Sequence, residues 1–173
     1  MVKSQKKKWI ATLIMASVGM ALVSLFSAAE KDGIAFSASS RHFSNPKPTP
    51  LFIDFIGSCL INTKESQPGD EVAVFTSTGI LCGAVAVTTA GQYGVLHVYG
   101  DDPSTEEIEG ALPGEELMFV VWDSHLKTEY TLSPDEMAPV SLGSFSSSPI
   151  PVVWKADKSR YGLNLTINRL SEK

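Results

Sequence analysis

The densest group of ionisable side chains in this 173-residue chain is a run of carboxylates in its second half. Asp101, Asp102 and Glu106 lie close together, and Glu107 and Glu109 follow. Calcium in proteins takes about six to eight oxygen ligands, mostly carboxylates and carbonyls. The run is therefore a candidate calcium site formed by Asp101, Asp102 and Glu106. It lacks the spacing of an EF-hand loop, and the alternative is a solvated loop that binds no cofactor.

Aromatic residues at every second position form another candidate site. Tyr93, His97 and Tyr99 share one face if this stretch is a strand, because side chains alternate along a strand. Aromatic rings stack on the apolar faces of sugars. Turned outward, these residues make a carbohydrate-binding platform, and turned inward they belong to the core. Leu96 and Val98 on the opposite face compete for the core, which favours the outward orientation.

The two cysteines, Cys59 and Cys82, could be joined by a disulfide if the protein folds in an oxidising compartment. Alternation with Ile53 and Phe55 places Cys59 on a core face. Cys82 lies in a run that is apolar on both faces, which is typical of an interior strand. A disulfide would contribute about 3 kcal/mol by closing the loop between them. Two buried, unpaired thiols are the alternative.

No arrangement of residues indicates catalysis. The three histidines, His42, His97 and His125, are far apart in sequence, and none has metal-ligand spacing to another histidine or a cysteine. The chain has no nucleophile elbow, phosphate-binding loop or dinucleotide fingerprint in a strand-to-helix context. We therefore predict that the protein is not an enzyme.

The elements that must position these residues are short strands. Apolar runs bounded by Pro and Gly recur about every ten residues, and none has sustained helical periodicity. The C-terminal run alternates most clearly, with Leu163, Leu165 and Ile167 on one face and Asn164 and Thr166 on the other. The pattern predicts an all-β domain, an antiparallel β-sandwich, with strands near 51–61, 71–77, 80–88, 94–99, 117–123, 126–132 and 161–169.

The N-terminus has the pattern of an export segment. Four lysines precede an uncharged run, residues 9–29, and Ser27 and Ala29 stand at the positions that an export peptidase reads. Residues 1–29 are either a signal peptide cleaved before Glu30 or an uncleaved membrane anchor, since the run is long enough to span a bilayer. In both cases the domain is exported, and its location is periplasmic, at the cell surface or secreted.

Residues 30–50 are polar and end with Pro46, Pro48 and Pro50, which predicts an extended tether. The remaining residues, 51–173, suffice for one domain. Without residues 1–29 the chain has 10 basic and 19 acidic side chains, a formal charge of −9. Such a charge repels phosphate backbones and anionic lipid heads, so nucleic acid is excluded as a partner. Contact with a membrane is expected through residues 9–29 alone, and only if this segment is not cleaved.

Two turns have a common pattern. Pro68-Gly69 and Pro113-Gly114 are each followed by two acids and an apolar run. Pro-Gly favours a tight turn, and the acids are expected to be solvated at the entrance to the strand.

These turns belong to a series of motifs over residues 51–132 that resembles the Ig-like or carbohydrate-binding-like β-sandwich modules of prokaryotic surface proteins. The resemblance implies a non-catalytic envelope or extracellular interaction module that binds another envelope or extracellular protein. The alternative is a carbohydrate-binding module that binds a glycan on its aromatic face. The motifs that carry the resemblance are Pro68–Val72, Gly79–Gly83, Tyr93-Gly94, Val98–Asp102 and Pro113–Phe119.

Overall fold

The computed structural model describes residues 42–44 and 46–169, and the predicted export segment, residues 1–29, lies outside them. In the part described, regular structure consists of strands and one short 3-10 turn, η1 (Pro134–Glu136). This part holds no helix with the length and apolarity needed to cross a membrane. The prediction of an all-β domain is confirmed.

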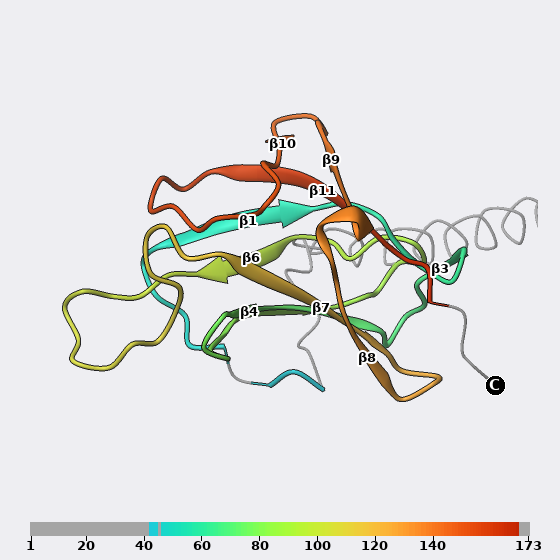
Figure 1. The fold of residues 1–173 in the computed structure, drawn as a ribbon, viewed down its shortest axis with the longest axis horizontal. Helices are drawn as coiled ribbons and strands as arrows, with labels where there is room; N and C mark the ends of the chain where they lie inside the picture. Colours follow the sequence, from blue (N-terminus) through green and yellow to red (C-terminus); the bar gives the residue numbers. More distant parts are fainter. Residues whose placement is uncertain (1–41, 45, 170–173) are drawn as a thin grey trace, which may run out of the picture. The chain divides into compact units, whose positions relative to one another are not determined.

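The strands form two sheets (Figure 1). The larger sheet has seven strands, and its main path runs β3-β2-β11-β1-β6. The last strand, β11, also pairs with β9 and β10. The members of this sheet are β1 (Phe52–Ile56), β2 (Cys59–Ile61), β3 (Lys64–Glu65), β6 (Leu96–Tyr99), β9 (Met137–Val140), β10 (Ser146–Ser147) and β11 (Arg160–Ile167).

The smaller sheet has the order β5-β4-β7-β8 and is antiparallel throughout. Its strands are β4 (Glu71–Thr76), β5 (Leu81–Ala86), β7 (Leu117–Asp123) and β8 (Thr128–Thr131). Cys82 is the extra residue of an irregularity in β5, since Val74 pairs with Gly83 and Phe75 with Leu81.

The larger sheet corrects one prediction. It is mixed, because β11 runs parallel to β1, β2 and β10 and antiparallel to β9. The prediction of antiparallel strands is therefore right for the smaller sheet and wrong for the larger one. All seven predicted apolar runs contain strands, and the first is divided into β1 and β2 at Gly57 and Ser58.

One hydrophobic core lies between the sheets. Ile53 and Phe55 of β1 and Leu163 and Leu165 of β11 are fully buried in the same cluster as apolar residues of β4 and β7. The rings of Phe55 and Phe119 meet across the sheets at 5.2 Å in an edge-to-face arrangement. Apolar burial from both sheets is the main force that holds them together.

The edges of the two sheets approach each other at Gly83. A Cβ at this position would lie 2.1 Å from the carbonyl oxygen of His97 in β6. The interior strand predicted around Cys82 is in fact the last strand of its sheet, and its outer edge lies near β6 instead of a hydrogen-bonded neighbour. The missing side chain of Gly83 thus permits the contact between the sheets at this edge.

The end of the predicted tether lies against the domain. The Thr49 hydroxyl is 2.7 Å from the carbonyl oxygen of Gly100. Phe43 is 6% exposed and packs on the smaller sheet. In Figure 1 residues 42–44 run beside β4 and β7 on the side away from β1 and β11. Thr49 and Phe43 of this segment thus contact the folded domain.

Replacing Gly83 tests the contact between the sheet edges. We expect Gly83→Ala to lower the free energy of unfolding by about 1–3 kcal/mol, because a backbone carbonyl cannot move aside as a flexible side chain can. Ala84→Ser, which adds one heavy atom to the neighbouring half-buried residue, is the matched control and should cost less. Urea unfolding measures both, and equal losses would contradict the contact.

Candidate functional site

The strongest candidate site is a group of five side chains on the outer face of the larger sheet. They come from three neighbouring strands in the order β6, β1, β11. Asp54 stands directly opposite His97 on one side and Arg160 on the other, and Phe52 stands opposite Tyr99. We call this group, Phe52, Asp54, His97, Tyr99 and Arg160, the aromatic patch.

Asp54 connects the polar members of the aromatic patch. Its Oδ1 atom lies 2.6 Å from His97 Nδ1, and its Oδ2 atom lies 3.7 Å from Arg160 Nε. The Asp54 side chain is 12% exposed, whereas those of His97 and Arg160 are 34% and 49% exposed. The carboxylate is thus held from both sides, and the other two groups remain accessible to a ligand.

The aromatic members lie beside this polar row. Phe52 meets His97 edge-to-face at 5.4 Å, and its ring centroid is 6.3 Å from that of Tyr99. Both Phe52 and Tyr99 are half-buried, so part of each ring faces solvent. Burial and the nearby Asp54 charge raise the pKa of Tyr99 above its usual value. The phenol therefore stays protonated and can both donate and accept a hydrogen bond.

The predicted platform is corrected at one residue. Tyr93 is 1% exposed, and its hydroxyl donates to the carbonyl oxygen of Leu163 at 2.7 Å. It precedes β6, so the alternation that places His97 and Tyr99 outward does not extend to it. Leu96 and Val98 fill the core as expected.

Sequence reasoning missed the other members of the aromatic patch. The alternation in β1 does place Asp54 opposite to Ile53 and Phe55, and that polar residue in an apolar strand was the available signal. Arg160 could not be located in the same way. It reaches Asp54 through parallel pairing of two strands that are about a hundred residues apart in the chain.

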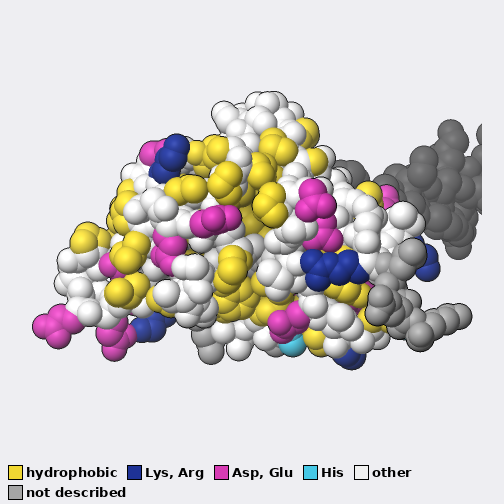
Figure 2. Space-filling view, viewed as in Figure 1, with side chains coloured by type: hydrophobic (Ala, Val, Ile, Leu, Met, Phe, Trp, Pro, Cys, Tyr) yellow, Lys and Arg dark blue, Asp and Glu magenta, His cyan; other side chains and the backbone are white. Residues whose placement is uncertain are grey.

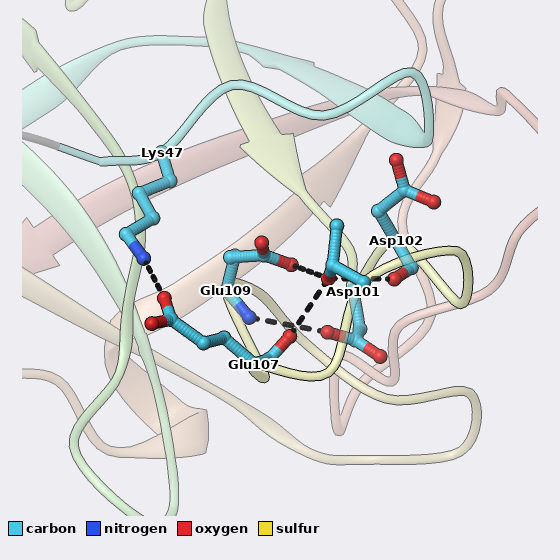
Figure 3. A network of polar contacts seen from close by, with 6 residues as sticks. Lys47, Asp101, Asp102, Glu107 and Glu109 are labelled. Carbon is cyan, nitrogen blue, oxygen red and sulfur yellow. Dashed lines mark hydrogen bonds and ion pairs between the residues drawn. The ribbon is translucent and has the colours of Figure 1, made fainter.

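The candidate calcium residues lie on the loop between β6 and β7, and Figure 2 shows acidic side chains at that end of the molecule. Asp101 and Asp102 already accept hydrogen bonds within the loop, and Figure 3 shows the bond to Asp101 from the Glu109 amide. Asp101 Oδ1 accepts from the Glu109 amide at 3.1 Å, and Asp102 Oδ1 accepts from the Ser104 amide and hydroxyl. Glu106 is exposed.

The same bonds account for the electrostatics of this loop. The Ser104 amide and hydroxyl lower the pKa of Asp102, and an ion pair with Lys47 at 2.6 Å lowers that of Glu107. Lys47 belongs to the predicted tether, so the loop holds part of that segment. Within residues 42–44 and 46–169, no group of three or more carboxylates, histidines or cysteines is arranged to hold a metal ion.

The two cysteines are buried free thiols in the structure. Cys59 belongs to β2 in the larger sheet, and Cys82 belongs to β5 in the smaller one. Burial raises the pKa of each thiol to about 12. Of the two alternatives that the sequence left open, this arrangement is the one without a disulfide.

A hollow of about 380 Å³ lies elsewhere, beside β2, β3 and the end of β7. Its two most buried acids already serve local structure. Asp70 accepts hydrogen bonds from the amides of Gln67 and Ser124, and Asp123 accepts from the amides of His125 and Leu126. These carboxylates stabilise turns, and the hollow is a weaker candidate than the aromatic patch.

Neither a family model nor a curated protein nor a solved structure matches this chain.

The thiols can be tested by alkylation without reducing agent. We expect two reactive thiols per chain after denaturation and very slow labelling of the native protein. A thiol with a pKa of about 12 has a thiolate fraction about a thousandfold lower than one with a pKa near 9. Failure to detect thiols in the denatured, unreduced protein would establish a disulfide between Cys59 and Cys82 instead.

The loop can be tested with calcium. Because Asp101 and Asp102 are engaged within the loop, we expect millimolar calcium to change the melting temperature no more than sodium chloride of equal ionic strength. Differential scanning fluorimetry measures the shift. A calcium-specific rise that disappears in Asp101→Asn with Asp102→Asn would contradict this and identify a calcium site.

Proposed function

We propose that this protein is an exported, non-catalytic β-sandwich module whose role is to bind a ligand outside the cytoplasm, and that the ligand is a glycan. The two sheets that share one core support a sandwich of the Ig-like or carbohydrate-binding-like kind. The aromatic patch is the binding surface. Of the two roles expected from the sequence, the glycan-binding role has a specific surface in its favour.

The observation that carries this proposal is the row of polar groups beside two partly exposed rings. Sugars present an apolar C–H face and a rim of hydroxyl groups. Phe52 and Tyr99 offer ring surface for the first. His97 and Arg160 offer polar groups for the second, and both lie against Asp54 between them, so their spacing is fixed. Because the carboxylate and guanidinium charges offset each other, a neutral glycan suits the aromatic patch best.

The histidine of the aromatic patch fits binding better than catalysis. His97 Nδ1 faces Asp54 as in a catalytic dyad. Across residues 42–44 and 46–169, however, no serine, threonine or cysteine side chain is hydrogen-bonded to His97 as a nucleophile would be. His97 therefore acts as an oriented polar group at the centre of the binding surface.

A glycan array probed with the full chain tests the proposal. We expect binding to neutral glycans that falls at least tenfold in Tyr99→Ala and in Arg160→Gln, because the first loses the stacking surface and the second loses the guanidinium with most of its donors. His125→Ala, which removes an exposed histidine outside the aromatic patch, should bind normally. Melting temperatures must first show that each variant is folded.

Two results would contradict the glycan proposal. One is an array on which the folded wild-type protein binds nothing, and the other is binding that both variants retain in full. The first would favour a protein partner in the envelope or extracellular space.

A further inference from the structure

The outer face of the smaller sheet is apolar, and a short piece of the same chain covers it. Ala73 and Phe75 of β4 and Val120 and Trp122 of β7 form a cluster separate from the main core. Phe43 completes this cluster and meets Phe75 edge-to-face at 5.8 Å. The sheet therefore has buried apolar side chains on both faces, and residues 42–43, which we call the His-Phe segment, supply the cover on the outer one.

Glu71 binds the backbone of the His-Phe segment. Its Oε1 atom accepts a hydrogen bond from the His42 amide at 2.7 Å, and its Oε2 atom accepts one from the Phe43 amide at 2.9 Å. Glu71 is only 2% exposed, although the sequence predicted it as a solvated acid after the Pro-Gly turn. A buried carboxylate is costly unless it is hydrogen-bonded, so Glu71 favours a chain with two consecutive free amides at this place.

The imidazole gives the His-Phe segment a third contact. The ring of His42 stacks on Trp122 with centroids 3.6 Å apart and planes 5° apart. Its Nε2 atom lies 2.7 Å from Glu129 Oε1 on β8. The backbone amides, the phenyl ring and the imidazole of the His-Phe segment thus each contact different side chains of the sheet. Such a division of contacts is typical of peptide recognition by a folded domain.

We propose that this outer face is a peptide-binding site for the His-Phe segment, occupied by residues 42–43 of the same chain and exchangeable with that segment from a second copy. Release opens only the small outer cluster and leaves the core between the sheets intact. The connection to β1 contains Pro46, Pro48 and Pro50, which keep it extended. Exchange of identical segments between copies replaces each contact by the same contact.

A labelled peptide of residues 40–46 provides the test with full-length protein. We expect it to bind the vacated variant, His42→Ala with Phe43→Ala, and to bind the wild type at least tenfold more weakly, because the attached segment competes at high effective concentration. In the vacated background Trp122→Ala should weaken binding about tenfold. Met118→Ala, on the same face but outside the cluster, is the matched control.

Two further measurements make the test decisive. A peptide methylated on the Phe43 amide nitrogen should bind at least tenfold more weakly, because it cannot donate to Glu71. In the wild type, hydrogen exchange should show that the His42 and Phe43 amides open at least tenfold more often than the amides of β7. This second measurement remains available if the vacated variant fails to fold.

Equal binding to wild-type and vacated protein, or full binding of the methylated peptide, would overturn the proposal. So would absence of binding to a folded vacated variant. Exchange of the two amides only through global unfolding would also overturn it, since the segment would then be a fixed part of the fold.

Discussion

Strand β11 is the element on which the larger sheet depends. It pairs with β1, β2, β9 and β10, and the buried side chains of Leu163, Leu165 and Ile167 lie in the main core. The first two strands, β1 and β2, pair with different halves of β11, because the strand is interrupted at Gly57. That glycine is required there, since a Cβ would lie 2.0 Å from the carbonyl oxygen of Leu163. The sheet is therefore complete only when the last strand is in place, and the aromatic patch, which needs Arg160, is complete at the same step.

The sequence predicted much of this fold and little of its pairing. Alternation located the strands, and it placed Cys59 in the core and His97 outward correctly, because burial on one face leaves a period of two. It could not predict that β1 and β11 are parallel, since long-range pairing has no local signal. For the same reason Asp54 and Arg160 were missed as partners. Glu71 was assigned to solvent because the segment that buries it lies in a stretch whose composition resembles a linker.

The outer faces of the two sheets differ in polarity and in whether another part of the chain covers them. The face with the aromatic patch keeps charged and partly exposed groups, as in Asp54 and Arg160, and needs no cover. The other face is apolar along β4 and β7, and Phe43 covers it. This difference explains why the middle of β4 and most of β7 are apolar on both faces while β1 carries an acid in its middle. It also separates a surface suited to a soluble ligand from one suited to a chain segment.

The parallel pairing of β1 with β11 has a mechanical consequence. The chain enters β1 at Phe52 and leaves β11 at Ile167, so these two strand ends point in opposite directions along the sheet. Tension applied between them loads the hydrogen bonds joining the strands in shear, and the bonds must yield together instead of opening one after another like a zipper. When the force is applied at His42 instead of Phe52, the contacts of residues 42–43 take the load first, because these residues precede β1. Under force the domain is thus expected to lengthen in a small early step and then to resist strongly.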